Sequence, residues 1–310
     1  MSAATDTDAS TDAPAKRLRP HQLSLVLFIA IAGHAVSWPC AKGGSRAITD
    51  ALAALLEAHG GVIERDRPVD DLADLPDHGV AIFDTSPRAL ARVAGDALPA
   101  GYRDRLERFR YGPGVFKIDY ALSGSIPWTD PVCAGASTVH VGGTFDEIAA
   151  SERAAWRGEV CDRPFVMVCQ QSAMDDSRAP PGQHTGYAYC HVPAGCDVDM
   201  TAAIEAQLER FAPGFSDLIL ARHTLAPKDL EGRNRNCIGG AITGGAADLR
   251  QLFTRPVARL RPHTTPNPRI FLCSASTPPG GGVHGMGGYW AARAACRQLG
   301  LPMPPLSPEG

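Results

Sequence analysis

The chain has 310 residues, of which 44% are hydrophobic and 20% are charged. This composition is typical of a soluble globular protein and excludes a globally disordered chain. The net charge is −3, from 30 basic and 33 acidic residues, so we expect no nucleic-acid partner. The length predicts two domains or one large domain.

Glycine (32 residues) and proline (26 residues) make up nearly a fifth of the chain, against an average of about 12%. The glycines occur in pairs and triplets, which is typical of tight turns or of backbone that approaches a ligand closely. The nine cysteines include no Cys-x-x-Cys pair and no zinc spacing with histidine. We therefore predict reduced, buried cysteines in a cytoplasmic protein and no metal site. Cys190 and His191 are neighbours, but on a strand they would point to opposite faces, which disfavours thiol catalysis.

The first residues of the chain contain small, polar and acidic side chains, and we expect residues 1–20 to form a disordered tail. Leu23 to Ala32 (LSLVLFIAIA) is the most apolar stretch, and it is shorter than the roughly 20 residues that a membrane-spanning helix needs. We interpret it as a buried helix or as a helix that contacts an apolar ligand. A signal peptide is the alternative, since basic residues precede the run. A peripheral contact with a membrane surface through this run is a further hypothesis.

The first part of the chain has the element order of an α/β domain. Apolar residues at helical spacing predict a helix over 46–59, which ends at a glycine pair. Strands are predicted at 60–69 and at 80–84. A helix follows over 87–96, with Pro87 as its first residue and Ser86 or Thr85 as its cap.

The middle of the chain changes character and predicts a mixed α+β domain built on an antiparallel sheet. Short apolar runs separated by Gly, Pro and Asp predict strands at 115–122, 138–141, 165–170 and 187–192. Helices are predicted at 144–157 and 199–211. After residue 254 the α/β pattern returns, with a strand at 269–273, a glycine-rich loop and a helix at 289–299.

This last loop carries the strongest chemical signal, a Gly280-x-Gly282-x-x-Gly285 string between a strand and a helix. Glycines allow close backbone approach, and a helix N-terminus offers free N–H groups, so the pattern predicts an anion or pyrophosphate site. A primary dinucleotide motif opens a βαβ unit of about 30 residues, whereas 25 residues follow Gly285. We therefore interpret the loop as a second contact on a cofactor whose main loop lies elsewhere. The alternative is a turn that serves only strand–helix packing.

From Trp38 to Arg293 the chain resembles the C-terminal part of the phytoene desaturase-like flavoprotein family, the FAD-dependent oxidoreductases that include carotenoid desaturases and isomerases. The matching pieces are WPCAKGGSRAITDALAALLEAHGGVIERDRPV, AIFDTSP, RYGPGVFKIDYAL, GGAITGG and IFLCSASTPPGGGVHGMGG. The last piece resembles the family's closing FAD motif, in which glycines at a helix start face the flavin.

The resemblance implies FAD as the cofactor and implies its contacts. Gly43 and Gly44 match a glycine pair near the flavin ring, and Val69 matches the position whose backbone meets the adenine. The polar turn 233–236 matches a segment that runs toward the flavin. The closing motif supplies the remaining predicted contacts, which are Ser274, Ala275, Gly280, Gly281, Gly282, Val283, His284, Gly285 and Met286.

The resemblance and the element order together predict an α/β plus α+β fold. We expect a partial, discontinuous FAD-binding Rossmann-like domain from residues 21–87 and 262–300. A substrate domain with an antiparallel sheet, residues 88–261, would be inserted into it. Family members open with a βαβ unit that carries G-x-G-x-x-G, and residues 1–37 contain no such string.

The predicted function is an FAD-dependent oxidoreductase that acts by hydride transfer on an apolar small molecule, with catalytic residues that the sequence does not identify. The alternative is a truncated, non-catalytic subunit that binds an apolar ligand. In that case a flavoprotein partner chain, or a homo-oligomer, would complete the FAD-binding βαβ unit.

Overall fold

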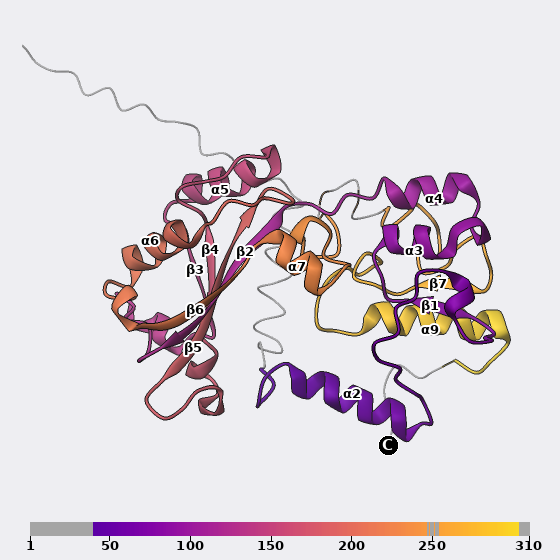
Figure 1. Ribbon diagram of the computed structural model, residues 1–310, viewed down its shortest axis with the longest axis horizontal. Coiled ribbons are helices and arrows are strands. Elements are labelled where there is room, and N and C mark those ends of the chain that lie inside the picture. The colour runs from indigo at the N-terminus through magenta and orange to yellow at the C-terminus, as the bar shows by residue number, and fades with distance from the viewer. Residues whose placement is uncertain (1–39, 247, 249–250, 252–253, 304–310) are drawn as a thin grey trace, which may run out of the picture. The chain divides into compact units, whose positions relative to one another are not determined.

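The computed structural model describes residues 40–303 except 247, 249–250 and 252–253 (Figure 1). The chain divides into two compact units, residues 1–52 and residues 53–310. The predicted tail at 1–20 and the apolar run Leu23–Ala32 lie outside the described residues. In the part of the chain that is described, no helix is long and apolar enough to cross a membrane.

The predicted helix over 46–59 is confirmed as α2, Arg46–Ala58, whereas the strand predicted at 60–69 is wrong. This segment is irregular, with Asp66 at a φ of 58°. Pro68 has no N–H to donate to a sheet, and the Arg67 side chain bonds Glu64 and the carbonyl of Asp74. Local polar contacts therefore replace strand pairing here.

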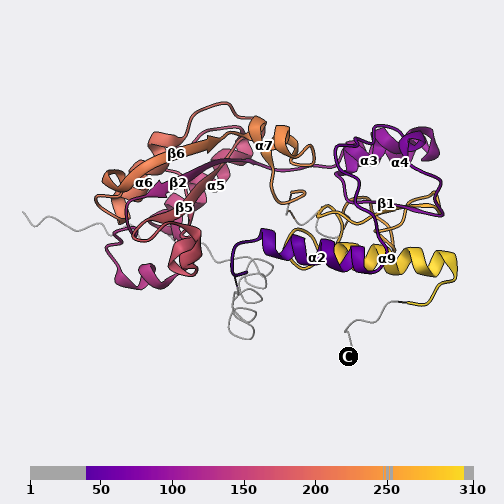
Figure 2. The same ribbon diagram turned by 60° about the horizontal axis from the view of Figure 1, so that its bottom comes forward.

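The carboxy-terminal strand and the strand after residue 80 are neighbours in space. β1 (Ala81–Phe83) pairs in parallel with β7 (Ile270–Leu272), with Ala81 opposite Ile270. The helices α3 (Pro87–Ala94) and α4 (Ala100–Glu107) lie on one side of the pair and α9 (Met286–Leu299) on the other (Figure 2). The predicted cap of α3 is confirmed, because the Ser86 hydroxyl accepts from the Ala89 N–H.

The core of this part extends further along the chain than the predicted domain limit at residue 87. Leu90 of α3 and Leu106 of α4 are fully buried in the same hydrophobic cluster as Ile270 and Leu272. The limit between residues 87 and 88 would cut through α3, so the packing favours a boundary after α4 instead. The two domains themselves stay a prediction.

The middle of the chain forms the expected antiparallel sheet, with strand order β3-β4-β5-β2-β6. Its strands are β2 (Gly114–Leu122), β3 (Thr138–Val141), β4 (Val166–Cys169), β5 (His184–Val192) and β6 (Ile219–Leu225). Its helices are α5 (Phe145–Arg157), α6 (Thr201–Phe211) and α7 (Pro227–Arg233). One face of β2 and β5, with Ile118 opposite Ala188, packs on Ile204 and Leu208 of α6.

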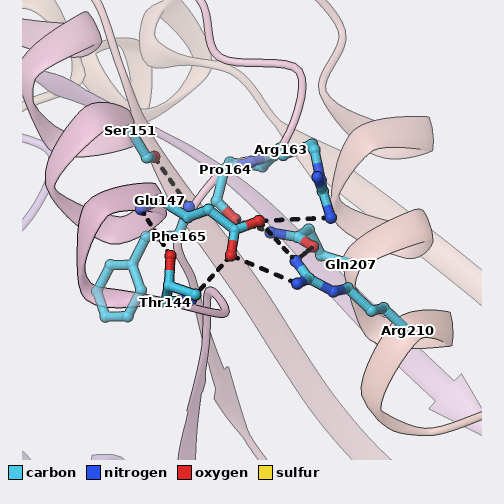
Figure 3. A network of polar contacts seen from close by, with 8 residues as sticks. All are labelled: Thr144, Glu147, Ser151, Arg163, Pro164, Phe165, Gln207 and Arg210. Atoms are coloured by element: carbon cyan, nitrogen blue, oxygen red, sulfur yellow. Dashed lines mark hydrogen bonds and ion pairs between the residues drawn. The ribbon is translucent and has the colours of Figure 1, made fainter. Parts of the chain in front are cut away.

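The loop that leads into β4 is held by polar contacts from α5 and α6 (Figure 3). The Ser151 hydroxyl accepts from the Phe165 N–H at 2.9 Å, and the Gln207 amide donates to the Pro164 carbonyl at 2.7 Å. Glu147 accepts from the Thr144 N–H at 2.8 Å and pairs with Arg210 at 3.1 Å. The Thr144 N–H, and then the Arg210 guanidinium, lower the pKa of Glu147 to about 2.

We expect Glu147→Gln to lower the thermal midpoint at neutral pH, because it removes the negative charge of the carboxylate that the Thr144 N–H and the Arg210 guanidinium stabilise. A carboxyl with a depressed folded-state pKa stabilises the fold above its unfolded pKa of 4.5, and this stabilisation is lost as the pH falls through about 2. Melting curves of both proteins should therefore differ most above pH 4.5 and converge toward pH 2. Glu159→Gln, an exposed control, should leave the profile unchanged. A constant offset at every pH would contradict the prediction.

Candidate functional site

The glycine-rich loop joins the carboxyl end of β7 to the start of α9. Ser274 and Gly280 are buried and Ala275 is half-buried, whereas all residues from Gly281 to Gly285 are exposed. Gly285 precedes the helix with a φ of 64°, and Met286 is its first residue. The structure thus presents an exposed glycine backbone directly before a helix N-terminus, an arrangement that favours an anionic ligand.

Hydroxyl groups anchor the buried half of this loop. The Thr277 hydroxyl donates to the Ser274 carbonyl at 2.7 Å, and the Ser276 hydroxyl donates to the Gly244 carbonyl at 2.7 Å. All three side chains are at least nine-tenths buried. No role was predicted for Ser276 and Thr277 from the sequence, although three hydroxyl residues after a predicted strand are a usable signal for a fixed loop.

Close packing at Gly287 brings the start of α9 onto the end of β7. A Cβ atom at this position would lie 2.2 Å from the Cys273 carbonyl oxygen. No side chain fits in that space, so the glycine sets the distance between strand end and helix. The N-terminus of α9 is therefore held beside the carboxyl end of the strand.

Segments that lie far apart in the sequence meet around this loop. The Cys273 N–H donates to the Phe83 carbonyl at 2.9 Å, which ties the loop to β1. The turn at 243–246 packs against it, because a Cβ at Gly244 would lie 2.4 Å from the Ala275 Cβ. The Asn236 side chain accepts from the Ser86 N–H at 2.7 Å. Three of the segments that carry the family resemblance thus meet at the carboxyl ends of β1 and β7.

A pocket of about 620 Å³ lies along β1 and beyond its carboxyl end. Val69, a predicted adenine contact, lines it together with Asp84, Thr85 and Asn236. Burial raises the pKa of Asp84, and the Thr85 hydroxyl is buried without a hydrogen-bond partner among the described residues. Asp84 and Thr85 were not predicted from the sequence, although polar residues directly after a buried strand are a known position for ligand contacts.

The remaining predicted contacts have separate surroundings. Gly43 and Gly44 lie in the first compact unit, before α2, with φ values of 80° and 98°. The exposed His284 ring accepts from the Met286 N–H at 3.0 Å, so it caps the start of α9. Val283 is 89% exposed and contributes no packing. A cofactor contact for each of these residues stays a prediction.

Thiol catalysis by Cys190 has no support in the structure. The Cys190 side chain is 1% exposed, and burial raises the pKa of its thiol to about 12. His191 points to the other face of the strand and pairs with Glu152 at 2.9 Å. The thiol and the imidazole therefore do not face one another.

Sequence comparisons connect the chain with oxidoreductases, although no family model matches it. It is 27% identical over 304 residues to pyridine nucleotide-disulfide oxidoreductase domain-containing protein 2 of Rattus norvegicus, covering 85% of this chain and 52% of that protein. It is 26% identical over 275 residues to the phytoene desaturase (neurosporene-forming) of Rhodobacter capsulatus, covering 78% of this chain and 50% of that protein.

Solved structures with a distant likeness include an oxidoreductase from Methanosarcina mazei, with 17% identity and a TM-score of 0.48, covering 79% of this chain and 52% of that chain. Another is putrescine oxidase bound to putrescine, with 14% identity and a TM-score of 0.44, covering 71% of this chain and 42% of that chain. The chain spans about half the length of the curated relatives that it matches. The expected resemblance is confirmed: 78% of the chain is covered by its similarity to a phytoene desaturase, and 85% by its similarity to a pyridine nucleotide-disulfide oxidoreductase domain-containing protein.

Proposed function

We propose that this chain is the C-terminal part of an FAD-dependent oxidoreductase that acts by hydride transfer on an apolar substrate. The observation that carries the proposal is the exposed glycine loop between β7 and α9, at the carboxyl ends of a parallel strand pair. Open α/β sheets bind ligands at the carboxyl ends of their strands. The relatives named above are oxidoreductases.

The residues present fit a cofactor of this kind. Exposed backbone at Gly281 and Gly282, followed by the start of α9, would hold negatively charged groups. The pocket that contains Val69 and Asp84 would receive the adenosine part, where the buried Thr85 hydroxyl is available as a donor. When bound, FAD supplies the hydride acceptor, and the protein contributes binding, orientation and electrostatics.

The strand pairing also supports a discontinuous cofactor domain. β1 and β7 are parallel partners, yet the whole antiparallel sheet lies between them in the sequence. That sheet has its own hydrophobic cluster, which is distinct from the cluster of β1 and β7. This arrangement is what an inserted substrate domain would produce.

A second candidate function is a subunit whose flavin site is completed by another chain or by a second copy of this one. The observation that favours it is the parallel sheet itself, which has two strands in the described part of the chain. Parallel sheets in α/β proteins usually have more strands and have both faces covered.

The test is a visible absorbance titration of the purified chain with FAD, with riboflavin as the control ligand that lacks phosphate and adenine. We expect a shifted, protein-bound flavin band that saturates with FAD, and weaker binding of riboflavin. A protein that leaves the FAD spectrum unchanged would exclude a flavin site made by this chain alone. Binding that occurs only with a co-purified partner chain would support the second candidate.

A further inference from the structure

Arg255 is a buried cation without a carboxylate partner among the described residues. Its side chain is 5% exposed, and burial lowers the pKa of its guanidinium. Other arginines of the chain pair with acids at more exposed positions, as Arg222 does with Glu205 and Arg92 with Asp70. Arginine is rarely buried without such a partner, because removing its charge from water is costly.

Most of the hydrogen-bonding capacity of this guanidinium is unused. Its Nη2 donates to the Ala275 carbonyl at 3.2 Å, and its Nε is buried with no partner. Arginine has five N–H donors, and in the described part of the chain a single acceptor meets them. The pair of glycines beside the guanidinium, Gly245 and Gly280, offers no side-chain acceptor.

One nitrogen of the guanidinium, Nη1, lies beside the glycine-rich loop of the candidate site. A Cβ atom at Gly280 would lie 3.2 Å from Nη1 of Arg255, and a Cβ at Gly245 would lie 3.0 Å from Nη2. At Gly280 the absence of a side chain leaves Nη1 without a side chain beside it, whereas the Phe109 ring occupies the space at Gly245. The exposed backbone of Gly281 and Gly282 follows immediately in the chain.

We propose that Arg255 is an anion-binding residue of this loop and that it binds a phosphate oxygen of the cofactor's pyrophosphate. A planar guanidinium matches the oxygens of a phosphate group in paired hydrogen bonds, and the nearby start of α9 favours the same charge. The pyrophosphate assignment rests on the proposed flavin function. The anion site itself rests on the burial and the unused donors of Arg255.

The first test needs no flavin and uses the full 310-residue chain. Thermal midpoints are measured in sodium pyrophosphate and in sodium chloride of equal ionic strength. We expect pyrophosphate to raise the midpoint of the wild type by roughly 2–4 °C, the effect of modest site occupancy. Arg255→Met should abolish this rise, and Arg255→Lys should keep part of it. Arg103→Met, which removes an equal charge from a surface pair with Asp96, should leave the rise intact.

The same melts separate ligand binding from a structural role. Without added anion, Arg255→Met should melt at the wild-type temperature or above it, because it removes an uncompensated buried charge. A lower midpoint together with an unchanged pyrophosphate response would show that Arg255 only supports the fold, and it would overturn the proposal.

The second test compares FAD with lumiflavin, which has the ring system but no phosphate. We expect Arg255→Met to weaken FAD binding about 10-fold or more and lumiflavin binding less than 2-fold. Equal FAD affinity in both proteins would leave the flavin function in place and overturn the role of Arg255. If pyrophosphate raises the thermal midpoint only when Arg255 is present, and the chain does not bind FAD, the anion site would be supported and the flavin assignment would be overturned. Equal weakening of FAD and lumiflavin binding would show that Arg255 contacts the flavin ring system, and it would overturn the pyrophosphate assignment.

Discussion

Gly282→Val is expected to abolish FAD binding, with an affinity loss of at least about 100-fold, or roughly 2.7 kcal/mol. Gly282 has a φ of 149°, a region that valine rarely adopts, and a Cβ there would lie 2.8 Å from the His284 ring. The branched side chain would also occupy the exposed face of the loop on which the cofactor is proposed to lie. Quenching of flavin fluorescence during titration of each protein measures the two affinities.

A matched control separates backbone strain from loss of the site. Gly182, in a loop before β5, also has a positive φ, 79°, and a Cβ atom at this position would have no heavy atom within 4 Å. Gly182→Val should therefore carry similar backbone strain while it leaves the flavin affinity within about 2-fold of the wild type. Wild-type flavin absorbance in Gly282→Val would show that the loop does not contact the cofactor.

The parts of the fold that local pattern specifies were predictable from the sequence. The apolar run that forms β7, the glycine string and the apolar spacing of α9 follow one another within 30 residues. Each element is encoded in its own segment, so the strand–loop–helix unit needed no information about distant partners. Likewise, Ser86 followed by Pro87 identified the start of α3.

Two segments whose state depends on a distant partner were missed or wrong. β6 exposes most of its residues, including Arg222 and His223, and is a strand because it pairs with β2. The segment 60–69 has comparable β-forming residues but pairs with no strand in the described part of the chain. Sheet pairing, rather than intrinsic preference, decides between the two outcomes.

The candidate site shows the same division. Its glycines were visible in the sequence, whereas Arg255 was not, because an arginine gains significance only through burial and through the absence of a partner. Val69 and Asp84 are 15 positions apart in the sequence and line one pocket in the folded chain. The sequence thus indicated the glycine loop of the candidate site but not the buried side chains around it.

Phe215→Ala is expected to cost about 3–5 kcal/mol of unfolding free energy, the usual range for deleting a buried aromatic side chain. Phe215 is 1% exposed in the cluster that packs α6 on the antiparallel sheet. Its ring meets the Tyr120 ring edge-on at 5.2 Å, so the substitution also removes an aromatic pair. Urea unfolding followed by circular dichroism gives the free-energy difference. Phe145→Ala deletes the same side chain where it is 63% exposed, and it should change stability by less than about 0.5 kcal/mol.

Which part of the chain loses stability in Phe215→Ala tests the proposed domain arrangement. The cluster around Phe215 shares no residue with the cluster that contains Leu272 of β7. If the antiparallel sheet is an inserted domain, Phe215→Ala should lower the transition of that domain and leave the flavin affinity of the folded protein unchanged. Leu272→Ala, which opens the other core at a cost of about 2–5 kcal/mol, should instead weaken flavin binding. Equal loss of flavin affinity in both variants would mean that the two cores unfold as one, and the inserted-domain proposal would then be wrong.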